Sequence, residues 1–552
     1  MKMFKKPKKW VILIIIFSVG SLALSQSDFY RKLGKSQRLI NEVYKQVFAT
    51  YVDELDPEAF TKASIRNITA ALDPYTVYME EDERDNINIL AYGKYGGVGI
   101  QLGWRNKQLS VIAPMDGSPA KAAGILSGDI IIKVDDQNVE KLSLDEAAHL
   151  IRGERGTEVK LTIKRYGIDD FLDFSITRAN IKVKDVTYSG LITPSTGYVR
   201  LSRFSRNAAQ EMRSALTDLI NQNVKEIIID LRDNPGGLLN SAVSILDMLI
   251  TEGQLLVTTK GRTKESNKTF YSKNDPIVPE SINIAILINH GSASASEIVS
   301  GAIQDLDRGL ILGQKSFGKG LVQSVYNLDK TKTLKITTAK YYIPSGRLIQ
   351  KSDYIDTSFV LNKTQSDTLF KSINGRTVKG NGGITPDSII DYGPLPVLTT
   401  EYWRRGFFFS FAQKYKPEYT SMKEVEADTS LLDKFSGFVA DQIVHIQLPG
   451  EKELEQLNEK IKQVDSTNNQ VAVAINDIKA FYNQRRSTLF QTEQDKIHQQ
   501  LLIEFAGLLE GPAGRTRQVL KNDPSIGAAI DLMSDKLAYD SFLAKSITQT
   551  QN

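Results

Sequence analysis

The stretch from residue 284 to residue 304 constrains the fold of this chain more than any other. Five apolar residues, 284–288, predict a buried strand, and residues 297–304 predict a helix. A turn rich in small hydroxyl residues, 291–296, joins them. Such a turn lifts a side chain out of the sheet and leaves the first N–H groups of the helix unpaired, so that they can hold an oxyanion. The stretch therefore predicts an α/β layer that carries a candidate serine nucleophile, Ser294.

A candidate base follows in a glycine-flanked loop. Lys319 stands 22 residues after Glu297, in the loop 316–320 behind a second apolar strand at 310–312. A serine hydroxyl is a weak nucleophile and needs a base within hydrogen-bond reach. Lysine can be that base only when neutral, which requires desolvation to lower its pKa. No acid adjoins Lys319 in the sequence, and Gln323, four residues on, can orient its amine.

A second turn can complete the site. Gly236 and Gly237 follow the apolar strand at 226–231. Their backbone N–H groups, with that of Ala295, form the candidate oxyanion hole.

Each of these residues also has another interpretation. Ser294 can be a helix N-cap, a role for which three serines compete, and Lys319 can be a solvated loop lysine. Residues 313–320 nearly match a phosphate-binding P-loop. Against this, Gly320 lacks the hydroxyl that would hold magnesium, and a β-like run follows where a helix should meet the phosphate. His290 can be the base of a serine–histidine pair, but no strong acid stands near it in the sequence.

The regions around this segment differ in character. Residues 1–25 combine five lysines with a short apolar stretch, which predicts a signal peptide or an uncleaved membrane anchor, with the rest of the chain outside the cytoplasm. Residues 28–91 predict helices, and residues 92–180 predict a small β-barrel with two helices. Residues 182–395 alternate strands and helices, as in an α/β core. Residues 400–552 predict a helical accessory region without a chemical motif.

Composition excludes several other chemistries. The chain has no cysteine, which excludes thiol catalysis, disulfides and thiolate metal sites. Its four histidines are far apart and lack the spacing of zinc ligands. A net charge of +4 over 552 residues does not indicate a nucleic-acid-binding face. We therefore expect no metal, no cofactor and no nucleic-acid partner.

Several short motifs accompany the serine and the lysine in order along the chain. They are Leu72-Asp73-Pro74-Tyr75, Gly97-Val98-Gly99-Ile100, Asp116-Gly117-Ser118-Pro119-Ala120, Asp129-Ile130-Ile131-Ile132, Asp230-Leu231-Arg232-Asp233-Asn234-Pro235-Gly236-Gly237 and Gly383-Ile384-Thr385-Pro386-Asp387. Together with the serine–lysine block, they make residues 35–395 resemble the carboxy-terminal processing peptidases, also called tail-specific proteases.

The resemblance implies a role for each candidate. Ser294 is the nucleophile, Lys319 the general base and Gln323 the residue that orients the lysine. It further implies a multidomain α/β protein with a crotonase-like ββα peptidase core, into which residues 92–180 are inserted as a PDZ domain. A PDZ domain binds a peptide as an added strand and captures its terminal carboxylate with backbone N–H groups. The loop Gly97-Val98-Gly99-Ile100 fits that task.

Two functions fit these features. One is an exported serine endopeptidase, periplasmic or anchored in the membrane, that selects substrates by their C-terminal tails. The other is a catalytically silent PDZ scaffold, which would tolerate loss of Ser294, Lys319 or Gln323, whereas all three are present. We expect protein or peptide partners with free C-termini and leave a homo-oligomer open. We also expect a chain ending near Pro396 to keep the whole active site.

Overall fold

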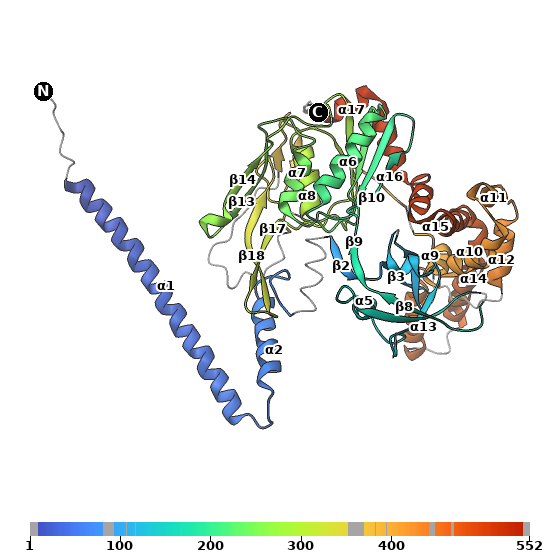
Figure 1. The fold of residues 1–552 in the computed structure, drawn as a ribbon, viewed down its shortest axis with the longest axis horizontal. Coiled ribbons are helices and arrows are strands. Elements are labelled where there is room, and N and C mark those ends of the chain that lie inside the picture. The colour runs from blue at the N-terminus through green and yellow to red at the C-terminus, as the bar shows by residue number, and fades with distance from the viewer. Residues whose placement is uncertain are drawn as a thin grey trace. The chain divides into compact units, whose positions relative to one another are not determined.

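The fold is that of a computed structural model of the chain, in two compact units, Met1–Tyr78 and Met79–Asn552 (Figure 1). The described residues are 9–80, 93–105, 108–115, 117–166, 168–351, 369–380, 382–393, 395–440, 448–464 and 469–544. Residues 1–8 of the expected signal segment, residues 81–92 and Asp116 of one motif lie outside them.

The first unit consists mainly of two helices, α1 (Lys9–Thr50) and α2 (Pro57–Ala70). Asp56 caps α2, because its side chain accepts hydrogen bonds from the first backbone N–H groups of the helix. The rings of Tyr44, Phe48 and Phe60 join the two helices. In the described part of the chain, no helix has an apolar stretch long enough to span a bilayer.

A small β-barrel domain opens the second unit. Its strands are β2 (Lys94–Gly97), β3 (Ile100–Arg105), β4 (Gln108–Pro114), β5 (Ile130–Val134), β6 (Gln137–Asn138), β7 (Glu158–Lys164), β8 (Leu172–Thr177) and β9 (Ala179–Lys182). The main sheet runs β3-β4-β5-β7-β8, so that β3 stands at an edge, and β2 pairs with β9. Two helices, α4 (Pro119–Ala122) and α5 (Leu144–Ile151), complete the domain, and α5 packs beside β3.

The α/β core is built on a six-stranded sheet. Its order is β10 (Val186–Leu191), β11 (Thr196–Leu201), β12 (Glu226–Asp230), β15 (Asn283–Ile288), β16 (Leu310–Gly313) and β21 (Ser388–Ile389). All neighbours are parallel except β10 and β11. Such a sheet is buried on both faces, which explains its continuous apolar strands.

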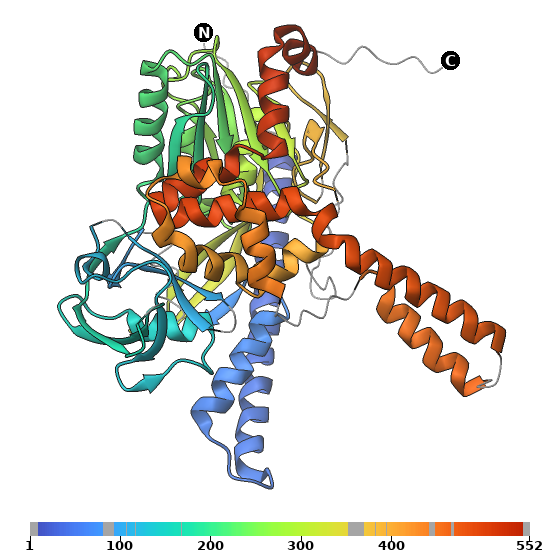
Figure 2. The ribbon, with the colours of Figure 1, turned by 90° about the vertical axis from the view of Figure 1, so that its right-hand side faces the viewer.

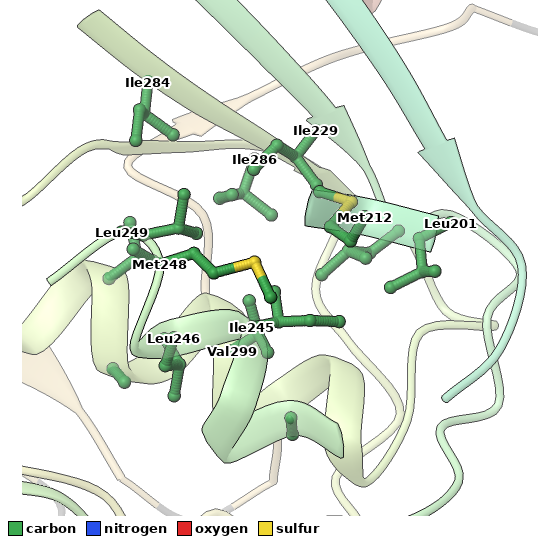
Figure 3. Close-up of a cluster of buried hydrophobic side chains, with 14 of the residues drawn as sticks. Leu201, Met212, Ile229, Ile245, Leu246, Met248, Leu249, Ile284, Ile286 and Val299 are labelled. Carbon is green, nitrogen blue, oxygen red and sulfur yellow. The ribbon is translucent and has the colours of Figure 1, made fainter. Parts of the chain in front are cut away.

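Helices cover one face of this sheet. They are α6 (Ala208–Asn221), α7 (Leu239–Leu246) and α8 (Ala295–Asp305). Because strand side chains alternate between faces, Ile229 and Ile286 point to these helices and meet Met212 and Val299 (Figure 3).

The end of the chain covers the other face. Here Ile228 and Leu287 pack against Ile526 and Met533 of α16 (Pro524–Ser534), and α17 (Lys536–Leu543) follows. The hydroxyl of Tyr539 in α17 exchanges two 3.0 Å hydrogen bonds with the backbone of Ile284 in β15. The last helices of the expected accessory region thus form a layer of the α/β core.

A second, antiparallel sheet is built from strands that are interleaved along the chain with those of the first sheet. It contains β13 (Leu255–Gly261), β14 (Lys268–Tyr271), β17 (Leu321–Asn327) and β18 (Thr333–Tyr342). The loop between β16 and β17 carries Lys319. A short ribbon of β19 (Leu369–Lys371) and β20 (Thr377–Lys379) follows.

The C-terminal helical extension is confirmed (Figure 2). It contains α9 (Val397–Arg404), α10 (Phe407–Tyr415), α11 (Met422–Ala427), α12 (Leu431–Ala440), α13 (Glu451–Val464), α14 (Asn469–Thr492) and α15 (Gln494–Leu520). Its core is rich in aromatic rings. The rings of Phe408 and Phe435 stack with their centroids 5.0 Å apart, and the ring of Phe411 meets that of Phe505 edge-on. The multidomain α/β architecture expected from the sequence is therefore present.

Candidate active site

Ser294 occupies a strained position at the start of α8. Its φ of 55° and ψ of −112° lie in a region that non-glycine residues rarely adopt. Such conformations persist only where the surroundings hold them, and they gather at functional sites. The turn around Gly236 lies against it: a Cβ added at Gly236 would stand 2.9 Å from the Cβ of Ser294 and 2.7 Å from the carbonyl oxygen of Ala293. This close contact explains why residue 236 is a glycine, since a side chain would collide with the turn that carries Ser294.

A single carboxylate joins Ser294 to the loop 316–320, which carries Lys319 and is called the lysine loop below. The Oε2 atom of Glu297 accepts hydrogen bonds from the backbone N–H of Ser294 at 2.8 Å and of Lys319 at 2.9 Å. Its Oε1 atom accepts from the N–H of Gly318 at 2.6 Å and the hydroxyl of Ser316 at 2.5 Å. The structure therefore brings the main chains of the predicted nucleophile and base together. Both side chains are partly buried.

Glu297 was not among the residues predicted for the site. It is fully buried, and burial raises the pKa of its carboxyl to about 7, although its four hydrogen bonds act in the opposite direction. The sequence did contain a signal, because Ser294 and Glu297 match the S-x-x-E capping pattern at a helix start. That pattern predicts the bond to Ser294 but not the bonds to the lysine loop.

The predicted oxyanion donors have different surroundings. The N–H of Gly236 already donates to the side-chain oxygen of Asn234 at 2.9 Å, so it is not available in this structure. Asn234 also holds the turn 291–296, called the serine turn below. Its backbone carbonyl accepts hydrogen bonds from the N–H of Ala293 and the hydroxyl of Ser296. In the described residues, the N–H groups of Ala295 and Gly237 have no hydrogen-bond partner.

Gln323 lies near the start of β17, at a bulge opposite Thr337. The hydrogen bond described for its amide goes to the hydroxyl of Thr337 at 3.4 Å. The lysine-orienting role of Gln323 thus remains a prediction. His290, the alternative base, has an exposed side chain.

A buried charge cluster stands beside the Gly236 turn. The carboxylate of Asp230, at the end of β12, accepts from the hydroxyl of Tyr198 at 2.7 Å and from Arg232 at 2.6 Å. The other side of the Arg232 guanidinium pairs with Asp523 at 2.7 Å. Asp523 also accepts from the N–H of Ser525 and so caps α16. The sequence analysis included Asp230 and Arg232 in a motif but did not predict Asp523.

The predicted carboxylate loop joins β2 to β3 in the small barrel. Gly99 has a φ of 77°, and a Cβ there would stand 2.4 Å from the Cβ of Ser118. The carbonyl of Val98 accepts from the N–H of Ala120 at 3.0 Å, and the Val98 side chain is buried. Gly97 ends β2 and Ile100 begins β3. The loop therefore ends at the edge strand of the barrel.

No cluster of three or more histidine, aspartate or glutamate side chains that could hold a metal ion occurs among the residues the structure describes.

Comparisons with known proteins agree with this architecture. Peptidase family S41 matches residues 195–357, and the PDZ domain matches residues 110–165. A family described as "Probable PDZ-protease, C-terminal helical domain" matches residues 398–533. The chain thus has the domain organisation of a serine-type peptidase with a PDZ domain.

The chain belongs to the carboxy-terminal-processing proteases. It is 36% identical over 341 residues to the carboxy-terminal-processing protease of Bartonella bacilliformis, covering 61% of this chain and 77% of the relative. It is 33% identical over 357 residues to a probable CtpA-like serine protease of Staphylococcus epidermidis, covering 64% and 72%. Among solved structures, the photosystem II D1 C-terminal processing protease is similar at 26% identity, covering 65% of this chain and 94% of that one, with a TM-score of 0.37.

Proposed function

We propose that the chain is a serine endopeptidase of the periplasm or cell exterior that cleaves proteins selected by their C-terminal tails, with Ser294 as nucleophile and Lys319 as general base. One observation carries the assignment of the pair: a single oxygen of Glu297 accepts the main-chain N–H groups of both residues. This shared acceptor supports the pairing, because a nucleophile and its base must be held close together for proximity catalysis.

In the proposed reaction, the neutral amine of Lys319 takes the hydroxyl proton of Ser294 as the Oγ attacks the scissile carbonyl carbon. The carbonyl oxygen becomes an oxyanion, which the N–H groups of Ala295 and Gly237 stabilise. The ammonium of Lys319 then gives its proton to the leaving amine, and the peptide bond breaks. A water molecule, deprotonated by the same lysine, then attacks the carbonyl carbon of the ester. The bond between that carbon and the Oγ of Ser294 breaks, and Lys319 returns the proton to Oγ. Gln323 orients the lysine amine.

Tail selection is assigned to the small barrel. The loop Gly97-Val98-Gly99-Ile100 ends at the edge strand β3, which a substrate tail can extend as an added strand beside α5. The loop's backbone N–H groups then meet the terminal carboxylate. The setting outside the cytoplasm is supported by the lysine-rich start and the apolar stretch after it.

Cleavage of a tail-labelled peptide tests the proposal. Wild type should cut it, and Ser294→Ala should not. Ser300→Ala is the matched control, because the buried Ser300 hydroxyl donates within α8, to the carbonyl of Ser296 at 2.8 Å. Wild type that binds the tail but never cuts would support the silent scaffold instead. Cleavage by Ser294→Ala would remove Ser294 as the nucleophile.

A further inference from the structure

A second side chain connects the two catalytic candidates. Tyr341, near the end of β18, is 1% exposed. Its hydroxyl donates to the main-chain carbonyl of Ser294 at 3.1 Å and, over a shorter distance, to that of Lys319. Its backbone N–H donates to the carbonyl of Gly320 at 3.0 Å. Through these bonds Tyr341 holds both the lysine loop and the serine turn.

One hydroxyl serves two acceptors. A tyrosine O–H carries a single hydrogen, so the carbonyls of Ser294 and Lys319 share it around one oxygen atom. Both carbonyls must remain within hydrogen-bond reach of that oxygen. The phenol ring is rigid and buried, so this oxygen cannot move far from the packed end of β18.

Tyr341 complements Glu297. Glu297, from α8, binds the N–H groups of Ser294 and Lys319, whereas Tyr341, from β18, binds their carbonyls. The two supports come from different layers and act on opposite ends of the same two residues. Such a double constraint accounts for the strained φ of Ser294, which needs surroundings that hold it.

We propose that the Tyr341 hydroxyl is a positioning group that sets the approach of the Lys319 amine to the Ser294 hydroxyl. Its hydroxyl binds the main-chain carbonyls of both residues and so acts on the reacting groups through the positions of their main chains. The inference rests on the proposed roles of Ser294 and Lys319. A small displacement of one reacting group can lower a rate by about 100-fold, so loss of this hydroxyl should slow the acylation of Ser294.

Tyr341→Phe tests the proposal, because it removes one oxygen atom and keeps the ring. Tyr342→Phe is the matched control. Tyr342 is the next residue in the strand, and its ring lies under the ammonium of Lys260 at 4.8 Å. Successive strand side chains point to opposite faces, so the control loses a hydroxyl away from the serine turn.

Two readouts separate positioning from a general loss of structure. A fluorophosphonate probe, which reacts with an activated serine, gives the rate constant of labelling and the final labelled fraction. Peptide cleavage gives kcat and KM. For Tyr341→Phe in the full chain we expect labelling and kcat to fall roughly 10- to 100-fold. The labelled fraction should stay near that of wild type and KM should change little, while Tyr342→Phe behaves as wild type.

Other outcomes would overturn the proposal. A wild-type labelling rate in Tyr341→Phe would show that the hydroxyl does not position the pair. A reduced labelled fraction with an unchanged rate constant, or a variant unfolded at the assay temperature, would assign the hydroxyl to folding. Failure of the serine–lysine assignment itself looks different, because wild type would then be labelled no faster than Ser294→Ala.

Discussion

Asp523 forms a 2.7 Å ion pair with Arg232. Both side chains are nearly buried, at 8% and 11% exposure. The pair joins the start of α16 to the residues that follow β12, beside the Gly236 turn. The C-terminal segment is therefore connected to the residues before the Gly236 turn by charge, as well as to the sheet by packing. This changes the expectation that a chain ending near Pro396 would keep the site intact.

A chain ending at Pro396 should fail to form the peptidase core. It would expose the sheet face that includes Tyr198, Ile228 and Leu287, which α16 and α17 bury. Exposed apolar area of this kind drives aggregation. Circular dichroism and light scattering against a control chain ending at residue 544 would measure the effect. A folded, monodisperse truncated chain that still cuts a short peptide would contradict it.

Asp523→Ala should destabilise the core. It leaves the buried guanidinium of Arg232 without one of its two carboxylates and removes the cap of α16. Breaking a buried pair from one side costs about 3–5 kcal/mol. We expect a lower melting temperature by calorimetry, whereas Asp540→Ala, at an exposed position of α17, should melt as wild type. Equal melting of both variants would show that the pair contributes nothing.

Ser294→Ala, Lys319→Ala and the double variant should have similar residual rates. In the proposed mechanism the two groups act in one proton transfer, so removing the second costs little once the first is lost. Lys319→Arg should be equally inactive, since a guanidinium stays charged and cannot accept the proton. Peptide cleavage measured for each variant decides the point. An active Lys319→Arg enzyme would exclude lysine as the base.

Glu297→Gln should lower kcat about 100-fold. The carboxylate accepts four hydrogen bonds, whereas an amide has one oxygen and turns an N–H₂ group toward backbone donors. Ser300→Ala, on the same helix, is again the control. If Glu297→Gln kept the wild-type kcat, the hydrogen bonds by which Glu297 joins Ser294 to the lysine loop would not be needed for activity.

The same residue predicts a pH dependence. Burial raises the pKa of Glu297 from its usual 4.5 to about 7, so the folded state binds this proton more tightly than the unfolded state. Its contribution to stability is complete below about pH 4.5 and is lost as the pH rises through about 7. The melting temperature of wild type relative to Glu297→Gln should therefore fall between pH 5 and pH 8. Activity, in contrast, should decrease as the pH is lowered below 7, since a protonated carboxyl accepts fewer hydrogen bonds. If the melting temperatures of wild type and Glu297→Gln differed by the same amount at pH 5 and pH 8, the raised pKa of Glu297 would be refuted.

Binding of substrate tails should depend on their free carboxylate and on Gly99. Inactive Ser294→Ala protein should bind an apolar C-terminal peptide and lose most of that affinity when the peptide is amidated, because amidation removes the charge. Adding Gly99→Ala should also weaken binding, since this position has a φ of 77° and lies against Ser118. Gly117→Ala is the control: it also has a positive φ, but a Cβ there meets no atom within 4 Å. Titration calorimetry with the free and the amidated peptide gives the two affinities. Equal values would exclude the loop Gly97-Val98-Gly99-Ile100 as the site that binds the terminal carboxylate.

The sequence determined the local parts of this protein. Apolar strands such as β15, the serine turn before α8 and the glycine-flanked Lys319 follow from periodicity and turn chemistry, which act over a few residues. The same is true of the small barrel, the alternation of strands and helices, and the helical C-terminal extension. A run of motifs in order was enough for the family, because each motif is short and contiguous.

Only the tertiary structure decided which distant groups meet. The sequence marks Glu297 as a helix residue, yet its carboxylate binds the loop of Lys319. Tyr341 is one aromatic residue of a strand, yet its hydroxyl reaches two carbonyls from separate loops. Asp523 lies in a region without motifs, yet it pairs with Arg232. Periodicity shows that a side chain points inward, but its partner depends on how the layers pack, which no local pattern encodes.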